Sequence, residues 1–407
     1  MVELNKAPPL LFTDMDYKKV LQEISVALDY YTEQENPPGL LGGYAGCALF
    51  YAYYYNLTGK KKHLKKVHTL LLKSIQALSE EELVPSHCNG ISGIVWCIQH
   101  LINAEFASAD GMEDVFGEVD TLLGQVMEQE IKENRYDFLH EGLGIALYFL
   151  EKEQPSPYLN TLVKQLEAVA YRDERGVRWR DFVFGTRLGD PEEPAFNLGL
   201  AHGTPSIISV LGILHQKGIK SPLMKESIDW LLSTRNEPEE GITSLYPVLV
   251  NEKNEAMTGK QSRLGWCYGD LSIAMTLLNT GNWLENDQYK EEAHKIFTYT
   301  LQHRNNNNGS VSDACLCHGS AGIAHIYRRA YLTLKDPRLL LGAEHWLQQT
   351  LQMKTWKDGL AGFKFYADGK YENSYGILEG ISGIGLSLIA ALDPATTPAW
   401  DRCLLLS

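Results

Sequence analysis

One short pattern recurs seven times along the chain, and it restricts the fold more than any other feature. Each copy is a turn of small residues, usually Gly-x-x-Gly or Gly-x-x-Ser, that opens directly into an apolar stretch of helical length. Self-similarity at intervals of 47 to 66 residues indicates a repeat architecture. The anchor positions are Gly43, Gly90, Glu141, Gly203, Gly269, Gly319 and Gly380.

An amphipathic segment precedes each apolar stretch. Such segments begin at Asp16, Lys61 and Asn286, for example, and their apolar residues recur at helical spacing. The run KKKHLKK (60–66) is interpreted as the solvated face of one of them. Each repeat therefore predicts an outer amphipathic helix, a turn, and an inner helix that must be buried on every side because it is apolar nearly all round.

These repeats predict an all-α fold, an α/α toroid with seven outer and seven inner helices, made by residues 1–407 as a single domain. No terminal repeat resembles the polar cap that an open solenoid needs. Because every hairpin runs from outer to inner helix, the inner N-termini should gather at one end, where their dipoles favour thiolates and other anions. Three longer connections are expected to cover that end with short β-hairpins and loops, namely 173–199, 241–265 and 356–376.

Charge and cysteine content exclude several classes of protein. A net charge of −14 argues against a nucleic-acid partner, which needs clustered Lys and Arg. No apolar run reaches the roughly 18 residues that span a bilayer, and the N-terminal segment lacks the pattern of a secretion signal. We therefore predict a cytoplasmic protein without membrane insertion. Its seven cysteines form no compact disulfide framework, so the informative ones are expected to be metal ligands or nucleophiles.

Two cysteines and one histidine stand at matched positions beside the anchors. Cys267 and Cys317 lie two residues before the anchors of adjacent repeats, and His318 follows Cys317. Adjacent repeats are neighbours in the predicted ring, so these side chains can converge. Two thiolates and one imidazole suit Zn²⁺, and three protein ligands leave the fourth position open, as catalytic zinc requires. We predict one zinc ion per chain.

The other cysteines fit this pattern less well. Cys88 occupies a ligand-equivalent position, but its neighbour Asn89 is a poor ligand. Cys315 could compete as a ligand, although it lies outside the matched position. The remaining thiols are interpreted as core or surface residues and are Cys47, Cys97 and Cys403.

The motifs WCYGD (266–270), CHGSAGI (317–323) and GLAHGTPSI (199–207), together with the Gly-x-x-Gly repeats, resemble the lanthionine synthetase C family, the cyclases of lanthipeptide biosynthesis. The resemblance covers the whole chain. Without a large extension before the first repeat, the chain is expected to be a stand-alone cyclase rather than the C-terminal part of a fused dehydratase–cyclase.

The resemblance implies the same zinc ligands, Cys267, Cys317 and His318. It also implies four active-site residues, which are His202, Arg263, Asp137 and Tyr268. Glu141 departs from the family pattern, because glycine is usual at this anchor, and the departure puts the placement of Asp137 in doubt. His140 stands at a ring position too and is expected to line the site.

The implied substrate is a precursor peptide whose Ser and Thr residues have been dehydrated. A peptide Cys thiolate would add to the β-carbon of a dehydro residue and close a thioether ring. His202 would supply the proton, Asp137 would orient His202, Arg263 would stabilise the enolate, and Tyr268 would lie beside the ligands. Expected partners are a lanthipeptide dehydratase and a transporter, which would hold the enzyme at the inner face of the membrane.

Four alternatives stay open at this point. Some relatives add glutathione to dehydrated residues, and their zinc site would be the same. A non-catalytic scaffold that binds the peptide should have lost a zinc ligand, whereas all three are present here. A zinc enzyme resembling prenyltransferase β subunits would need an Asp ligand, which no matched position offers. A glycosidase would need a carboxylate pair across the mouth, for which Glu379 and Glu141 are the candidates.

Overall fold

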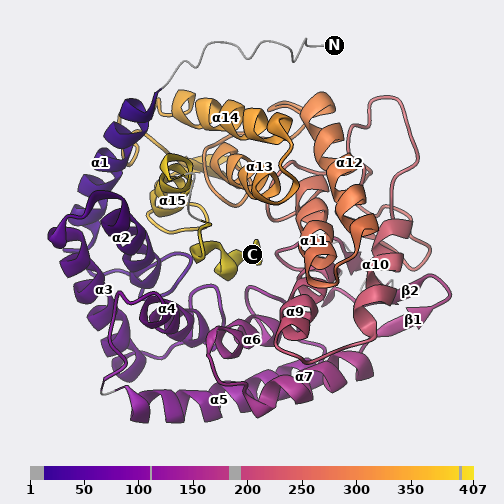
Figure 1. The fold of residues 1–407 in the computed structure, drawn as a ribbon, viewed down its shortest axis with the longest axis horizontal. Coiled ribbons are helices and arrows are strands. Elements are labelled where there is room, and N and C mark those ends of the chain that lie inside the picture. Colours follow the sequence, from indigo (N-terminus) through magenta and orange to yellow (C-terminus); the bar gives the residue numbers. More distant parts are fainter. Residues whose placement is uncertain (1–12, 111, 183–193, 394–396) are drawn as a thin grey trace. The chain divides into compact units, whose positions relative to one another are not determined.

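The computed structural model describes residues 13–110, 112–182, 194–393 and 397–407 (Figure 1). They form two compact units. The first unit comprises Met1–Leu83, Cys88–Ala107 and Phe297–Trp400, and the second comprises Val84–His87, Ser108–Ile296 and Asp401–Ser407. That the chain forms a single domain stays a prediction. No helix among the described residues is both long enough and apolar enough to cross a membrane.

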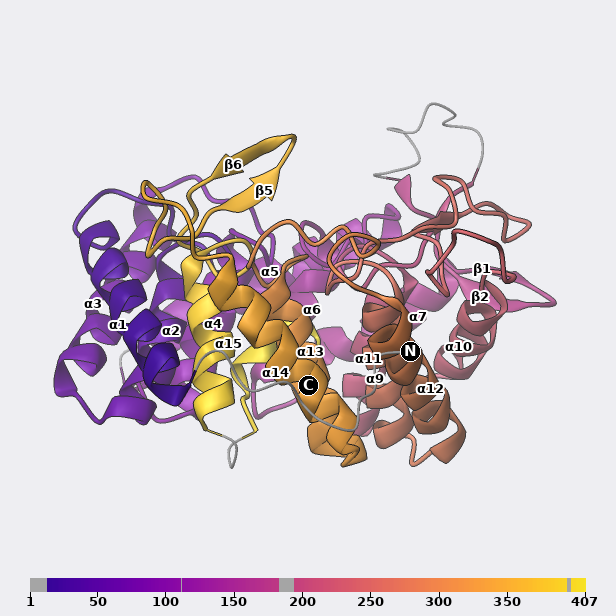
Figure 2. The same ribbon diagram turned by 90° about the horizontal axis from the view of Figure 1, so that it is seen from above.

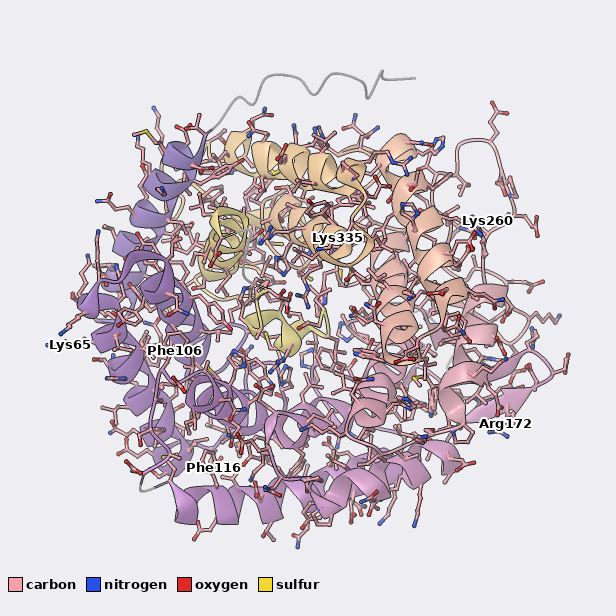
Figure 3. All side chains as sticks on the ribbon, in the orientation of Figure 1. Lys65, Phe106, Phe116, Arg172, Lys260 and Lys335 are labelled. Atoms are coloured by element: carbon pink, nitrogen blue, oxygen red, sulfur yellow. The ribbon has the colours of Figure 1, made fainter. Side chains whose placement is uncertain are left out.

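Helices make up most of the first unit. In this unit α2 packs on α3 and α15, and α13 packs on α14 and α15. Its helices are α1 (Asp14–Tyr31), α2 (Tyr44–Thr58), α3 (Lys61–Glu80), α4 (Ile91–Asn103), the end of α12 (Asp287–His303), α13 (Ser320–Leu334), α14 (Pro337–Gln352) and α15 (Ile381–Leu392). Lys65 points outward from α3, as expected of a solvated face (Figure 3).

The second unit is built in the same way. Here α5 packs on α6 and α7, and α9 packs on α10 and α11. Its helices are α5 (Glu113–Lys132), α6 (Gly142–Glu151), α7 (Pro157–Ala168), α9 (Thr204–Gln216), α10 (Leu223–Ser233), α11 (Asp270–Trp283) and the start of α12, and a short 3₁₀ helix, η1 (Trp400–Leu404), begins the C-terminal segment. The Trp266 indole N–H donates to the carbonyl of Leu404 and fixes that segment within this unit.

The predicted alternation of helices is confirmed in the described part of the chain. Seven amphipathic helices alternate with seven apolar ones, and each apolar helix begins directly after its predicted anchor, which is the N-cap residue. All ten residues of α6 are buried, as an all-apolar helix requires.

Close packing explains the second glycine of the motif. A Cβ atom at Gly46, Gly144, Gly322 or Gly383 would lie 1.9–2.1 Å from the carbonyl oxygen of the residue six positions earlier. Glycine thus lets the preceding loop fold directly onto the first turn of the helix. Where Ser replaces glycine, its hydroxyl bonds to the N-cap carbonyl, as Ser206 and Ser272 do at 2.7 and 2.8 Å.

Short strands occur in the three longer connections, as predicted. β1 (Tyr171–Asp173) pairs with β2 (Gly176–Arg178), and β5 (Phe365–Ala367) pairs with β6 (Lys370–Glu372). β3 (Phe196–Asn197) pairs antiparallel with β4 (Leu249–Val250) and joins the connections 173–199 and 241–265. Within the first connection, 183–193 lie outside the described residues. Figure 2 shows the β5–β6 hairpin projecting beyond α13 and α15 of its own unit.

Gly144→Ala should lower the free energy of unfolding by about 1–3 kcal/mol, the usual cost of overpacking. Its Cβ would lie 2.1 Å from the Phe138 carbonyl oxygen and 2.7 Å from Cβ of His87. Gly117→Ala is the matched control in the same unit, because no atom lies within 4 Å of the position that its Cβ would take, and it should raise stability by about 0.4–1 kcal/mol. Denaturant melts measure both changes, and equal midpoints for the two variants would contradict the packing argument.

Candidate functional site

A carboxylate–imidazole pair is the central feature of the second unit. Nδ1 of His202 lies 2.6 Å from Oδ2 of Asp137, with the two side chains 16% and 4% exposed. His202 directly precedes the N-cap of α9, and Asp137 lies in the loop before α6. The α6–α9 packing brings these two helix ends together. The structure thus brings together two of the residues that the family resemblance implies for the site.

The loop around Asp137 fixes its carboxylate. Oδ1 accepts the backbone N–H groups of Leu139 and His140, both at 2.9 Å. Oδ2 is left to face His202. The exposed ring of His140 lies 5.9 Å from that of His202 and lines the pair, as expected.

Glu141 supports this loop instead of displacing it. Its backbone (φ −131°, ψ −165°) matches that of the equivalent Gly203 (φ −126°, ψ −168°), so a side chain is tolerated. Its Oε2 accepts the N–H of Asp137 at 3.1 Å, and its Oε1 accepts from Arg135 Nε at 3.2 Å. The departure from glycine therefore leaves Asp137 in place, and the Glu141 carboxylate is engaged by the loop before α6 rather than presented as half of a glycosidase pair.

Two opposing effects set the pKa of His202. Burial lowers it, but the hydrogen bond and the charge of Asp137 raise it more, with further help from the charges of Cys267 and Asp181. The net effect is a pKa raised above the ordinary histidine value. A raised pKa favours the protonated imidazole, which is the form that can act as a general acid.

Cys267 and Tyr268 lie against the loop that carries His202. The N–H of Ala201 donates to the Cys267 carbonyl at 3.3 Å, and the rings of Tyr268 and His202 are 6.0 Å apart. Gly199 permits this approach, because a Cβ there would lie 2.4 Å from the Tyr268 ring. Burial is the main reason that the pKa of Tyr268 is raised well above its usual value, so the phenol stays protonated.

Arg263 is exposed and lies in the loop before α11. Its carbonyl oxygen would lie 2.1 Å from a Cβ at Gly269, which has φ of +91°. Gly269 thus differs from the other anchors, since both its backbone conformation and the space around it require glycine. The path of the Arg263–Cys267 loop depends on this residue.

Two further polar residues of the pair's surroundings were not foreseen. Asn197 donates from Nδ2 to Oδ2 of Asp181 at 2.6 Å, and its Oδ1 accepts the N–H of Gly199 at 2.8 Å. The charge of Asp181 raises the pKa of both His202 and Tyr268. Asn197 stands two residues before the GLAHG motif, so its closeness to that motif could have pointed to it. Asp181 follows β2 without any recurring pattern, so nothing in the sequence indicated it.

In the first unit, Cys317 and His318 directly precede the N-cap of α13. The N–H of Cys317 donates to the Leu378 carbonyl at 2.9 Å and ties this turn to the one before α15. The imidazole of His318 is 11% exposed, with its Nε2 3.3 Å from Oδ2 of Asp313. Cys317 and His318 thus belong to this unit, and Cys267 belongs to the other.

Asp313 is another residue that the sequence did not indicate. Burial raises the pKa of its carboxyl, but bonds to His318 and to backbone N–H groups lower it more, so the net direction is down. Asp313, Cys315 and His318 offer ligand atoms within 4.8 Å of one another, so this part of the first unit could hold a metal ion. The other thiols interpreted as core are fully enclosed and are Cys47, Cys97 and Cys403.

Asp137→Asn should lower the pKa of His202, because the effect of burial would then be opposed only by the smaller effects of the Cys267 and Asp181 charges. In the native protein the raised pKa means that His202 stabilises the fold fully below pH of about 6.5, and this contribution is lost as pH rises through the folded-state pKa. NMR titration of the imidazole in metal-free protein measures the change. Asp229→Asn, an exposed residue paired with Lys225, is the control and should leave the His202 pKa unaltered. An unchanged pKa in Asp137→Asn would contradict the coupling.

Comparison with known proteins places this geometry in a family. Nisin biosynthesis protein NisC of Lactococcus lactis subsp. lactis is 23% identical over 385 residues, covering 89% of this chain and 88% of that protein. The solved structure of nisin cyclase superposes with a TM-score of 0.76 at 20% identity, over 97% of this chain and 98% of that one. This likeness confirms the predicted fold class, an all-α α/α toroid. The profile of the lanthionine synthetase C-like proteins matches residues 34–405, and the chain belongs to this family.

Proposed function

We propose that this protein is a zinc-dependent lanthipeptide cyclase. It would add cysteine thiolates of a dehydrated precursor peptide to dehydroalanine or dehydrobutyrine residues, giving lanthionine or methyllanthionine rings. The observation that carries the proposal is the Asp137–His202 pair, because it places an imidazole with a raised pKa beside the loop of Cys267. Membership of the lanthionine synthetase C-like family and the similarity to NisC and nisin cyclase support the same reaction.

The donor set proposed for zinc is Cys267, Cys317 and His318. Two thiols and one imidazole suit Zn²⁺ and leave one coordination position for a substrate sulfur. Cys267 and Cys317 are both buried, and each lies two residues before the N-cap of an apolar helix, whose positive end favours the thiolate. When bound, zinc would lower the pKa of a substrate cysteine and hold it as a thiolate at neutral pH.

His202 would supply the proton that the reaction needs. Addition of a thiolate to the β-carbon forms a carbon–sulfur bond and moves the electrons of the double bond toward the neighbouring carbonyl, as an enolate. The enolate then takes a proton at its α-carbon. With Nδ1 held by Asp137, Nε2 of His202 is the ring nitrogen that would donate that proton. Asp137 would raise the pKa of the imidazole and orient its ring.

Arg263 would stabilise the enolate, and Tyr268 would line the site beside His202. Arg263 is exposed on the loop that leads to Cys267, so its guanidinium can reach a bound peptide and offset the developing negative charge. Tyr268 stays protonated and packs beside His202. It would therefore line the site and donate a hydrogen bond rather than act as a base.

The partners follow from the substrate. Dehydrated residues must be made before cyclisation, so we propose a lanthipeptide dehydratase as the enzyme that supplies the peptide. Export of the product would bring in a transporter. Such a complex would work in the cytoplasm, at the inner face of the membrane.

Mass spectrometry with a synthetic peptide that carries one cysteine and one dehydroalanine tests the reaction. The zinc-loaded enzyme should leave the peptide mass unchanged while protecting its thiol from alkylation, because ring closure adds and loses no atoms. With glutathione in the mixture, a mass increase by one glutathione would instead favour the glutathione-adding activity. A peptide that stays fully alkylatable, with no mass change, would indicate a scaffold that only binds.

His202→Asn supplies the matched control for this assay. The variant should retain its zinc and bind peptide, but close the ring about 10²–10⁴-fold more slowly, the usual contribution of a general acid. Ring closure at the native rate would remove His202 from the mechanism while leaving the cyclase assignment intact.

Metal analysis checks the ligand set. The native protein should contain one zinc ion per chain, and Cys267→Ala should lose both the zinc and the ring-closing activity. Cys97→Ala is the control, because this fully buried thiol donates to the Ala45 carbonyl within the core and should be neutral for zinc. Retention of zinc by Cys267→Ala would show that the proposed ligand set is wrong.

A further inference from the structure

The imidazole of His318 is fixed from one side by two acceptors. Nε2 lies 3.3 Å from Oδ2 of Asp313 and 3.2 Å from the carbonyl oxygen of Tyr366 in β5. Neither acceptor has a proton to offer when Asp313 is ionised, so the hydrogen must be on Nε2 of His318. Nδ1 then carries the lone pair, and a metal ion can bind only there.

Asp313 is built into the fold as a fixed anchor. Its side chain is fully buried, Oδ1 accepts the N–H of Cys315 at 2.8 Å, and Oδ2 accepts the N–H of Tyr366 at 2.8 Å. Its carbonyl oxygen accepts the N–H of Ser320, the first residue of α13, at 3.0 Å. The carboxylate is therefore locked to the same helix end that carries His318.

These contacts argue against Asp313 as a metal ligand itself. The cluster of Asp313, Cys315 and His318 offers suitable atoms, but Nε2 of His318 already donates a hydrogen toward Asp313. Both carboxylate oxygens of Asp313 already accept backbone N–H groups. A metal ion at this cluster would have to displace the Tyr366 N–H and remove the hydrogen from Nε2.

We propose that Asp313 is the positioning residue for the metal ligand His318, orienting Nε2–H so that Nδ1 binds the ion. The inference rests on the zinc site of the proposed function. A carboxylate behind a ligating imidazole fixes its tautomer and raises its basicity, and loss of such a partner typically costs 10–100-fold in metal affinity. The backbone of Tyr366 also contacts Nε2 of His318 and Oδ2 of Asp313, so the β5–β6 hairpin would be part of the metal site.

Zinc titration of the metal-free protein against a chromophoric chelator tests this role. Asp313→Asn keeps the size of the side chain but removes its charge, and it should bind zinc about 10–100-fold more weakly than the native protein. Asp336→Asn is the matched control, since Asp336 caps α14 in the same unit by accepting the Arg338 N–H. It should bind zinc with native affinity. Native affinity in Asp313→Asn would overturn the inference.

Cys315→Ser separates the two ligand sets. It should bind zinc with native affinity if Asp313 only orients His318. Loss of zinc from Cys315→Ser would show that the Asp313–Cys315–His318 cluster holds the metal and would overturn the inference as well. Visible absorption of the cobalt-substituted proteins reports the number of thiolate ligands in each case, a readout that a change in stability alone does not move.

A measurement on the native protein covers the case in which Asp313→Asn fails to fold. Long-range ¹H–¹⁵N NMR spectra of the zinc-loaded protein identify which nitrogen of His318 binds the ion. Coordination through Nδ1 with a protonated Nε2 supports the inference, and coordination through Nε2 overturns it. If the native chain binds no zinc at all, the proposed function fails and the inference fails with it; a fault confined to Asp313→Asn leaves the function standing.

Discussion

The contact on which the structure depends is made where each loop folds onto the first turn of an apolar helix. At four of the seven repeats the carbonyl six residues before the second glycine occupies the space of its missing Cβ. At these repeats the contact fixes the residues just before the N-cap at the helix end. Cys317 and His318 owe their positions before α13 to it. Before α9 and α11, which follow His202 and Cys267, the hydroxyls of Ser206 and Ser272 bond to the N-cap carbonyl instead.

The same contact explains why so much of the fold could be predicted. The glycine spacing marks each helix start, and every predicted anchor is an N-cap residue. The pairing of β3 with β4 could not be foreseen, because each strand has two residues and they come from connections about fifty positions apart. The contact of Trp266 with the Leu404 carbonyl likewise leaves no periodic trace in the sequence.

The candidate site was predictable where its residues share a position in the repeat. Asp137 stands outside the matched positions and was known only through a resemblance, yet the structure brings it to His202. Asp313 and Asp181 were missed because they act through backbone N–H groups and neighbouring side chains that the chain brings together only on folding. Glu141 shows the converse, since a residue that breaks the pattern turns out to support the loop that it was expected to disturb.

The chain uses one interaction, a buried carboxylate against an imidazole, in two different ways. Asp137 holds Nδ1 of His202 and raises the pKa of the imidazole, so Nε2 is the nitrogen suited to give up a proton. Asp313 holds Nε2 of His318, so the nitrogen that carries the lone pair is Nδ1. A metal ligand needs a lone pair and a proton donor needs a hydrogen. The ring nitrogen that each carboxylate engages therefore decides whether the histidine can bind a metal ion or donate a proton.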